Sequence, residues 1–558
     1  MKRIVLSFLL ALAVLLAACS AQPVDNTPTT PAATTTSKSL EFSHPTWTDA
    51  QGNVYPTTGS TSVTLSTGTQ ATRPSGSGDA LEEDNRCEHA DADNNGLCDS
   101  CNYCVLAVVD LYVLNDLHGK FDDTAEQPGV DELTTYLKQC RNADDIALFL
   151  SSGDMWQVSS ESNLTQGLII TDWMNELVFS AMALGNHEYD WGEEAIEKNA
   201  EQAEFPLLAI NVFDRNTGKR VEYAEASVMV EQGGLQIGII GAIGDCYSSI
   251  SADKTEDIYF KVGSDLTALV KAEATRLRQA GADLIVYSLH DGYGQSKNGV
   301  TDIAGNALAS YYDVDLSNGY VDVVFEGHTH QRYVMKDRYG VYHLQNGGEN
   351  KGISHVEMTV NIANGKTAMA TAAFVANSTY THLEDDPLVD RLLDKYADDI
   401  AIGERMLGYN GRYRSSDYLC DLAARMYYEA GVERWGAQYD VVLGGGFLST
   451  RSPYDMDPGE ITYGMLQMLF PFDNDLVLCS VKGRDLKNKF VQTDNDRYHI
   501  YTGDHNLTHI DVNATYYIVV DTYTSQYKYN NLTEIARYDP GVYARDLIAE
   551  YILDGGLE

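Results

Sequence analysis

Basic residues are scarce in this 558-residue chain, which has 39 Lys and Arg against 81 Asp and Glu and a formal net charge of -42. This balance excludes broad electrostatic binding of nucleic-acid polymers or anionic membranes, because both would be repelled. A small anionic ligand would need locally concentrated positive charge, which bound metal ions can supply. Long apolar runs are also lacking, since no stretch beyond the N-terminal segment is long enough to cross a bilayer as a helix.

The N-terminal segment has the pattern of an export signal. Lys2 and Arg3 precede the apolar residues 4–16, a run that is short for a membrane span. Residues 16–19, Leu-Ala-Ala-Cys, resemble a bacterial lipobox, which implies cleavage before Cys19 and lipidation of this cysteine. The alternative is an ordinary secretory signal with an incidental cysteine. We therefore expect residues 1–19 to direct export, with a lipid anchor on the outer face of the cell membrane as the only membrane contact.

Two segments separate this signal from the globular part of the chain. Residues 20–84 are rich in Thr, Ser, Pro, Gly and Ala, which predicts a flexible tether. Residues 85–104, called the knob below, are rich in Cys, His and Asp and allow three interpretations. A structural zinc ion is the first, with four candidate ligands: Cys87, His89, Cys98 and Cys101.

A calcium site is the second interpretation of the knob, and disulfide bonds are the third. Asp91, Asp93 and Asn95 match the first half of a calcium-binding loop, in which alternate oxygen ligands face one ion. The twelfth loop position is Asn102, however, where a bidentate Glu is expected. Export would permit disulfides, but the spacing of the cysteines assigns no pairs.

The rest of the chain has the pattern of two α/β domains. Between residues 105 and 376, short apolar runs alternate with helix-like segments, which predicts a layered α/β domain. One such helix covers residues 264–280, with Ser264 or Asp265 as its cap. An interdomain helix is expected within residues 377–401, capped by Asp386. A smaller α/β domain follows over residues 402–558.

Polar side chains suited to metal binding follow the expected strands of the first domain. There are seven of them: Asp116, His118, Asp154, Asn186, His290, His328 and His330. Ligands in α/β sheets bind outside the carboxyl ends of the strands, so these side chains could converge on one site. Asp, Asn and His together suit divalent ions such as Mn, Zn, Fe or Co. Seven ligands exceed the needs of one tetrahedral ion and favour two ions that share a carboxylate, an arrangement used in phosphoryl displacement.

The order of these motifs, Asp-x-His, Gly-Asp, Gly-Asn-His-Glu, His and Gly-His-x-His, resembles that of the calcineurin-like metallophosphoesterases. With its second domain, the chain resembles bacterial 5'-nucleotidases and UDP-sugar hydrolases. The resemblance implies a four-layer β-sandwich flanked by helices. It also implies one metal held by Asp116, His118, Asp154 and His330, and a second held by Asp154, Asn186, His290 and His328, with Asp154 bridging the two.

The same resemblance implies the catalytic roles. His187 would stabilise the phosphoryl transition state or protonate the leaving alkoxide, and Asp190 would orient its imidazole. The nucleophile would be a metal-bound hydroxide, because metals lower the pKa of bound water to about 7.

The resemblance also implies a substrate-binding site in the second domain. Phe472 and Asn474 match the family segment in which a Phe stacks on the nucleotide base and an Asn hydrogen-bonds to it. Gly445 lies in the family's glycine-rich loop, which implies that it contacts the substrate, but this loop departs from the family pattern because Leu448 occupies the usual Arg position. Arg451, three residues later, is the expected replacement.

A last family motif, Phe followed by Gly-Gly-Asp-Gly-Tyr, is absent. Residues 522–529 stand in its place, and Tyr523, Tyr527 or Tyr529 could supply the second stacking ring. We favour Tyr527.

These features predict an enzyme that releases phosphate from nucleotides. The first alternative keeps the metals and changes the substrate to 2',3'-cyclic nucleotides, UDP-sugars or other phosphate esters. The second alternative is a non-catalytic surface binding protein, which the intact set of ligands argues against. The expected partner is thus a small nucleotide or phosphate ester, and the sequence specifies no oligomeric state.

Overall fold

A computed structural model describes most of the globular part of the chain. The described residues are 47–48, 54–55, 90–100, 105–121, 129–143, 146–292, 316–451, 453–493, 496–529, 531–539 and 541–557. Several predicted features lie outside them, namely Cys19, most of the tether, Cys87, His89 and Cys101. Within the described ranges, every helix is either too short or too polar to cross a membrane.

The chain divides into two compact units. The first comprises residues 1–107 and 359–368, and the second comprises residues 108–358 and 369–558. The first unit contains a short antiparallel pair, β1 (Trp47–Thr48) with β2 (Val54–Tyr55), and the described part of the knob. The second unit contains the seven predicted metal ligands. The domain boundaries predicted at residues 376 and 402 fall inside this second unit and stay predictions.

Two six-stranded sheets form the centre of the fold. The first has the order β16-β15-β3-β4-β5-β6, and its last four strands run parallel. Its strands are β3 (Leu106–Leu114), β4 (Ala147–Ser151), β5 (Ala181–Ala183), β6 (Leu207–Leu208), β15 (Gly352–Asn361) and β16 (Lys366–Ala376). The parallel strands are almost wholly buried, because both faces of this part of the sheet are covered.

The second sheet has the order β13-β14-β12-β11-β9-β8. Its four central strands run parallel, and both edge strands are antiparallel to their neighbours. Its strands are β8 (Ser227–Gln232), β9 (Leu235–Ile243), β11 (Leu284–His290), β12 (Val323–Glu326), β13 (Arg332–Lys336) and β14 (Tyr342–Asn346). Strands β5 and β6 contact β9, so the two sheets pack face to face.

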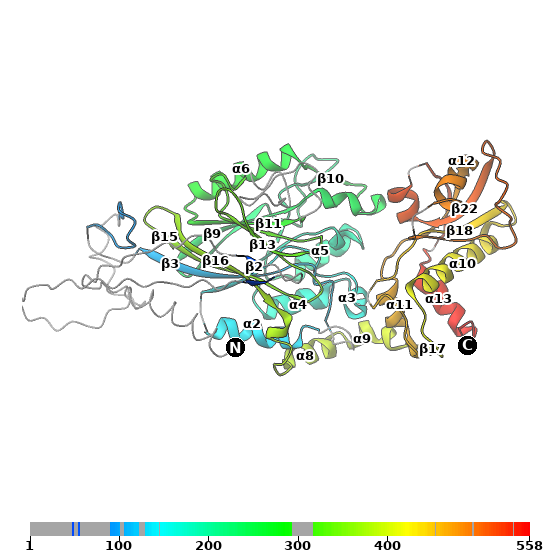
Figure 1. Ribbon diagram of the computed structural model, residues 1–558, viewed down its shortest axis with the longest axis horizontal. Helices are drawn as coiled ribbons and strands as arrows, with labels where there is room; N and C mark the ends of the chain where they lie inside the picture. The colour runs from blue at the N-terminus through cyan, green and yellow to red at the C-terminus, as the bar shows by residue number, and fades with distance from the viewer. Residues whose placement is uncertain are drawn as a thin grey trace, which may run out of the picture. The chain divides into compact units, whose positions relative to one another are not determined.

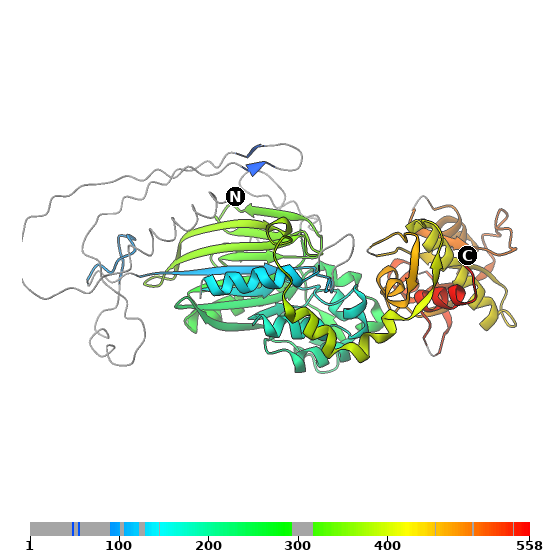
Figure 2. The ribbon, with the colours of Figure 1, turned by 90° about the horizontal axis from the view of Figure 1, so that it is seen from below.

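Helices cover the outer faces of both sheets. Helix α6 (Ser264–Gln279) packs on β9 and β11, and Figure 1 shows it on the side of the sheets opposite to α2 (Asp131–Ala143) and α8 (Pro387–Lys395), which belong to the helices of the first sheet. Those helices are α2, α4 (Leu168–Glu176), α5 (Glu193–Gln202) and α8. In Figure 2, α2 (cyan) and α8 (yellow-green) lie in front of the strands. The order helix, sheet, sheet, helix confirms the predicted four-layer class.

Helix starts test the local predictions. Helix α8 begins at Pro387, and the Asp386 side chain accepts a hydrogen bond from the Leu388 amide, as predicted for a capping residue. The predicted cap of α6 is wrong. Gly263 takes that position with a φ of 65°, and no side chain caps the helix, because a backbone in this left-handed region favours glycine.

Residues 402–558 form a mixed sheet with helices. The sheet has the order β21-β18-β22-β20-β23, and α10 (Ser416–Trp435) packs on β18 and α13 (Ala544–Leu553). Its strands are β18 (Val441–Phe447), β20 (Leu476–Lys482), β21 (Tyr498–Tyr501), β22 (Thr515–Asp521) and β23 (Thr533–Arg537). A two-stranded pair, β17 (Met406–Asn410) with β19 (Gly459–Thr462), leads into α11 (Tyr463–Leu469).

The described residues also contain shorter elements. These are α3 (Ser160–Leu164), the pair β7 (Val212–Asp214) and β10 (Ile258–Phe260), α9 (Ala397–Ile400), α12 (Gly483–Asp485), the helical turns η1 (His187–Tyr189), η2 (Asp245–Ser249), η3 (Ala252–Lys254), η4 (Asn377–Thr379) and η5 (Ala401–Glu404), and two six-residue helical turns, η6 (Leu486–Val491) and η7 (Tyr523–Lys528).

Candidate dinuclear metal centre

The carboxyl ends of both central sheets carry the predicted metal ligands. Strand β3 leads to Asp116 and His118, β4 leads to Asp154, and β5 leads to Asn186. In the second sheet, His290 is the last residue of β11, while His328 and His330 follow β12. Parallel strands end at the same edge of a sheet, and face-to-face packing brings the two edges together.

Asp116, His118 and His330 form the first cluster. Nε2 of His118 lies 2.9 Å from Nε2 of His330, which lies 3.4 Å from Oδ1 of Asp116. Nδ1 of His118 donates to the Gln157 carbonyl oxygen at 3.1 Å. Because a carbonyl oxygen can only accept, Nδ1 carries the proton and Nε2 keeps its lone pair for a metal.

Asp154, Asn186, His290 and His328 form the second cluster. Oδ2 of Asp154 lies 3.0 Å from Nε2 of His290, and Oδ1 of Asn186 lies 2.8 Å from Nδ1 of His328. Nδ1 of His290 donates to the Ser152 carbonyl oxygen at 2.7 Å, so its Nε2 is also left as the ligand atom. Asp116, Asp154 and His290 offer atoms within 4.8 Å of one another, which joins the two clusters.

The donor set fits two divalent ions. Two ligands about 2.1 Å from one ion lie about 3.0–3.4 Å apart, close to the separation of the His118 and His330 nitrogens. His290 is fully buried, and its Nε2 has no aligned hydrogen-bond partner among the described residues, although Asp154 is near. Imidazole nitrogens and buried carboxylates this close together are stabilised by bound cations, because burying a charged or polar group without a partner costs free energy.

The backbone around these ligands is held in the left-handed region. Five of the seven predicted ligands have positive φ: 51° for Asp116, 53° for His118, 55° for Asp154, 69° for His328 and 52° for His330. Each such residue costs on the order of 1–3 kcal/mol and persists only where its surroundings enforce it. The strain is therefore concentrated at the ligand-bearing loops.

Glu188 enforces this geometry, although sequence reasoning gave it no role. It is fully buried, and its carboxylate accepts hydrogen bonds from the amides of Asp154, Met155 and Gly185 at 2.8, 2.8 and 2.6 Å. It thus connects the loops after β4 and β5. Its place in the Gly-Asn-His-Glu motif was the available signal, whereas nothing in the sequence pointed to Gln157 as the acceptor for His118.

A cysteine also lies at this centre. The buried Cys246 offers its sulfur within 4.8 Å of ligand atoms of His290 and His328, and it donates to the His290 carbonyl oxygen at 2.9 Å. Burial raises the pKa of this thiol well above its ordinary value, and the nearby Asp291 and Asp154 carboxylates raise it further. A protonated thiol in this position acts as a hydrogen-bond donor.

His187 and Asp190 lie beside the ligands as a hydrogen-bonded pair. Nδ1 of His187 lies 2.6 Å from Oδ2 of Asp190, and both side chains are mostly buried. The amide of His187 donates to Oδ1 of Asp154 at 2.8 Å, which ties it to the predicted bridging carboxylate. Burial alone would lower the pKa of His187, but Asp190 and then Asp154 raise it to about 9.

Charges inside the centre set the protonation of the ligands. Burial alone would raise the pKa of Asp116, but His330 beside it lowers this pKa to about 2. Burial, with His330 and His187, lowers the pKa of His118 to about 3. An ionised Asp116 and a neutral His118 are the forms that bind a metal.

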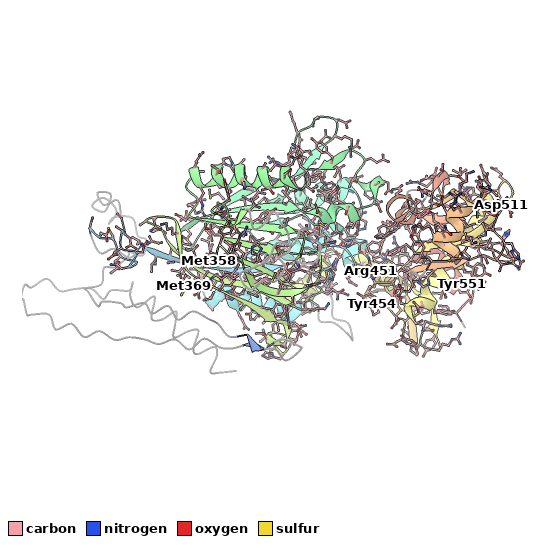
Figure 3. The ribbon with its side chains drawn as sticks, turned by 45° about the horizontal axis from the view of Figure 1, so that its top comes forward. Met358, Met369, Arg451, Tyr454, Asp511 and Tyr551 are labelled. Carbon is pink, nitrogen blue, oxygen red and sulfur yellow. The ribbon has the colours of Figure 1, made fainter. Side chains whose placement is uncertain are left out.

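The predicted base-stacking residue lies against the catalytic pair. The Phe472 ring is stacked on the His187 ring, with centroids 5.7 Å apart and planes 18° apart. The Arg451 guanidinium also lies over the Phe472 ring, with its central carbon 4.9 Å from the ring centroid. Arg451 and Tyr454 lie together in the loop after β18 (Figure 3), where the Tyr454 amide donates to the Arg451 carbonyl oxygen. Asn474 lies half-buried two residues after Phe472.

The glycine-rich loop departs from the family pattern for a packing reason. Leu448 is 5% exposed and belongs to the core beneath α10, so its position cannot present a guanidinium to a substrate. Gly445 has a φ of 124°, and a Cβ there would lie 2.1 Å from the His499 carbonyl oxygen of β21. Close packing of two strands thus explains this glycine, while its predicted contact with substrate stays a prediction.

The three candidate tyrosines for the second stacking ring lie in different surroundings. Tyr529 is buried against Phe490, with centroids 5.4 Å apart, and forms part of the core. Tyr523 is half-buried, 6.1 Å from Phe447 between centroids. The backbone of Tyr527 lies in η7, but its side chain is outside the described structure. Tyr523 and Tyr527 therefore remain the candidates.

The described part of the knob is a compact loop. Oδ1 of Asp91 accepts from the Asn95 amide at 3.0 Å, and Oδ2 accepts from the Gly96 amide and from the Asn361 side chain at 2.9 and 2.6 Å. Asp91, Asp93 and Asp99 offer oxygens within 4.8 Å of one another, and Cys98 is buried. Zinc, calcium and disulfides stay open as interpretations of this segment.

Comparisons with known proteins agree with the geometry. Residues 110–332 match the calcineurin-like phosphoesterase family. The chain is 25% identical to Protein UshA of Yersinia enterocolitica over 407 residues, which cover 66% of this chain and 72% of that protein. It is 31% identical to a 5'-nucleotidase of Vibrio cholerae over 230 residues, 40% of each chain.

A solved structure shows the same fold. The crystal structure of a 5'-nucleotidase precursor from Thermus thermophilus superposes with a TM-score of 0.59 at 20% identity, covering 80% of this chain and 97% of that one. The motif order, the four layers and the sequence matches agree. Residues 110–332 therefore form a calcineurin-like phosphoesterase domain, the chain as a whole is similar to 5'-nucleotidases, and it is a phosphoric ester hydrolase.

Proposed function

We propose that this hydrolase releases phosphate from nucleotides by two-metal catalysis. The observation that carries the proposal is the convergence of the seven ligands with the His187–Asp190 pair and the Phe472 ring at one edge of the two sheets. The ligands suit two ions, the pair suits proton transfer to a leaving alkoxide, and the ring suits a base.

Asp116, His118, Asp154 and His330 would hold one ion, and Asp154, Asn186, His290 and His328 the other. When bound, two divalent ions polarise the phosphoryl group and acidify water to a pKa of about 7. The ion identity among Mn, Zn, Co and Fe stays open, since imidazole and carboxylate ligands suit them all.

The chain's own residues then handle orientation and the proton. Asp190 accepts from Nδ1 of His187 at 2.6 Å, which leaves Nε2 as the atom that transfers a proton. The Asp190 and Asp154 carboxylates favour the protonated imidazole, in which Nε2 can donate to the leaving oxygen. Glu188 keeps the loops after β4 and β5 in place through its three backbone hydrogen bonds.

Recognition of the substrate would rest on residues between Gly445 and Tyr527. Phe472 and Asn474 would contact the base, and Arg451 would supply a guanidinium in place of the one missing at Leu448. This cation matters in a chain with a net charge of -42, because it lowers the local repulsion of a phosphate.

A second substrate class is favoured by one observation. The family's second aromatic motif is replaced by η7, in which Lys528 lies 4.6 Å from the centroid of Phe447 and 5.3 Å from that of Tyr523. A cation above aromatic rings changes what can stack there. The alternative is therefore the same metal chemistry on 2',3'-cyclic nucleotides, UDP-sugars or other phosphate esters.

The test is phosphate release by the purified chain without residues 1–19, supplied with Mn or Co. AMP, UMP, 2',3'-cyclic AMP, UDP-glucose and an aryl phosphate would be compared, with D154N and H187A as controls. We expect the monophosphates to be hydrolysed fastest and both variants to lose activity. Turnover of only the cyclic, diphosphate or aryl esters would contradict the preference for nucleoside monophosphates and support the alternative substrates. Metal binding without turnover of any substrate would favour the hypothesis of a non-catalytic binding protein.

We also propose that the protein is exported and anchored by a lipid on Cys19, on the strength of the lipobox resemblance alone. Labelled palmitate should be incorporated in cells that express the chain and lost with Cys19→Ser. Incorporation that persists in this variant would contradict the anchor.

A further inference from the structure

Residues 470–473, part of the connection between α11 and β20, are held by hydrogen bonds from two other segments of the second unit. From α13, the buried Arg545 donates to the carbonyl oxygens of Phe470 and Phe472, each at 3.3 Å, and pairs with Asp473. From the loop after β4, Nε2 of Gln157 donates to the Pro471 carbonyl oxygen at 3.1 Å. The backbone that carries the Phe472 ring is therefore held in place.

The imidazole of His187 has three neighbours that restrain it. Asp190 engages Nδ1, and the His118 ring meets it edge-on with centroids 5.2 Å apart and planes 72° apart. The third neighbour is Phe472, stacked nearly parallel at 5.7 Å. Only the third comes from residues 402–558.

These contacts restrain different motions. A hydrogen bond at Nδ1 fixes one atom of the ring but allows the plane to tilt about that atom. An aromatic ring stacked on the face resists the tilt, because offset-stacked rings have a preferred separation and orientation. Nε2 must point at the leaving oxygen to within a small error for proton transfer, so control of the plane affects the chemical step.

The same segment is also connected to the first metal cluster. Gln157 donates from its side chain to Pro471 and accepts at its carbonyl oxygen from Nδ1 of the ligand His118. One residue thus contacts both the segment that carries Phe472 and a metal ligand. Displacement of residues 470–473 would be felt at His187 directly and at His118 through Gln157.

We propose that Phe472 is a positioning residue for His187, so that residues 402–558 contribute to the proton-transfer step and not only to substrate binding. This inference rests on the proposed function, because it assigns a role within that reaction. It differs from base stacking in one testable respect: the effect of Phe472 must persist on a substrate that has no base.

The experiment compares AMP with glycerol 3-phosphate, which has an alkoxide leaving group and no base. F472L, F472Y, H187A and the double variant F472L/H187A would be assayed for kcat and KM. The matched control is F213L, whose ring is half-buried, stacks on Tyr259 and lies outside the metal centre. A second variant, Q157M, loses the hydrogen bond to Pro471 while keeping the ring and the backbone carbonyl.

We expect F472L to lower kcat by about tenfold on both substrates, a fraction of the full effect of a general acid. F472Y should restore kcat to within about twofold of the parent chain, since it keeps the ring. In the H187A background, F472L should change kcat little, because the two residues act as one unit. Q157M should lower kcat on both substrates, and F213L should change neither kcat nor KM.

The inference is overturned if F472L raises KM for AMP alone and leaves kcat on glycerol 3-phosphate unchanged, since Phe472 would then serve only the base. Additive losses in the double variant would overturn it as well. Absence of turnover by the parent chain on every phosphate ester would overturn the proposed function, and this inference with it. Should F472L fail to fold, the kcat of Q157M on glycerol 3-phosphate decides between the two outcomes.

Discussion

At the scale of single residues, the centre depends on close contact between backbone and ligand. Gly185 shows this most clearly, because a Cβ on it would lie 2.2 Å from Oδ1 of Asp154 and 2.7 Å from the Asp154 amide. No side chain can be added there unless the predicted bridging carboxylate moves. The glycine before Asn186 is therefore required by the ligand next to it.

Gly185→Ala should lower metal content and activity together. We expect at least about a hundredfold loss of turnover, because misplacement by about 1 Å can cost that much. Metal content by mass spectrometry and phosphate release would be measured on the same sample. Gly411→Ala is the control, since a Cβ at Gly411 meets nothing within 4 Å. Full metal content and activity in Gly185→Ala would show that Asp154 is not held as described.

Asp190→Asn should lower kcat with little effect on KM. The amide cannot stabilise a protonated His187 as the carboxylate at 2.6 Å does, so proton transfer suffers while binding does not. About a hundredfold fall in kcat on AMP is expected. Asp398→Asn, on the exposed helix α9, should leave kcat unchanged. A rise in KM at constant kcat would assign Asp190 to substrate binding instead.

Sequence reasoning reached the ligands at this scale but not their supports. Asp116, His118 and the other ligands follow apolar strands in a recognisable order, so they could be predicted. Gln157 supports His118 through a backbone carbonyl, and any residue type supplies one. Phe472 was predicted to stack on a base, but its contact with His187 joins residues 285 positions apart (472 minus 187), which no local pattern encodes.

At the scale of elements, burial of charge links strands β12 and β14. His343 is fully buried, with Nδ1 3.2 Å from Oε1 of Glu326 and Nε2 3.6 Å from Oδ2 of Asp337. Burial alone would lower the pKa of His343, but the neighbouring Asp337 and Glu326 carboxylates raise it to about 9. The protonated ring therefore holds two carboxylates together inside the second sheet.

This ion pair makes stability depend on pH. The folded pKa of His343 lies above the unfolded value of about 6.5, so its stabilisation is complete below about pH 6.5 and is lost as the pH rises through about 9. His343→Gln should lower the free energy of unfolding by about 3 kcal/mol at pH 6 and by less at pH 9.5. Urea unfolding at both pH values measures the difference.

His382→Gln is the control for this prediction, because His382 is exposed. Its free energy of unfolding should equal that of the parent chain at both pH values. An equal loss for His343→Gln at pH 6 and at pH 9.5 would show that packing, and not charge, is what His343 contributes.

Elements were predicted well where local chemistry decides them. Helix α8, for example, starts directly after its predicted cap, Asp386. The start of α6 was assigned to the wrong cap, because a glycine with positive φ supplies the turn there and polar side chains nearby gave a competing signal. The three candidate tyrosines for the stacking ring could not be ranked by sequence for a similar reason, because the burial of Tyr529 against Phe490 depends on tertiary packing.

At the scale of the whole molecule, metal binding and folding should be coupled. The centre collects two buried aspartates, four histidines and five strained backbones from both sheets. Ions bind this arrangement in the folded state far better than in the unfolded chain, so they stabilise the fold by mass action. Metal at about 100 times its Kd adds about 2.7 kcal/mol.

Removal of metal should therefore lower the Tm of the catalytic part by about 5 °C or more. Differential scanning calorimetry with and without EDTA, followed by readdition of Mn, measures the shift. D154N should show a smaller response to Mn, because it loses the shared ligand. A Tm that EDTA does not change would contradict tight binding at the two clusters.

The central claim is that two ions act together in a phosphohydrolase, and one titration tests it. Metal-free chain would be titrated with Mn while bound metal and AMP turnover are measured in the same sample. We predict that turnover rises to a plateau only as the second equivalent per chain is bound, and that D154N never reaches it. Full turnover at one equivalent, or in metal-free chain, would contradict the two-metal account.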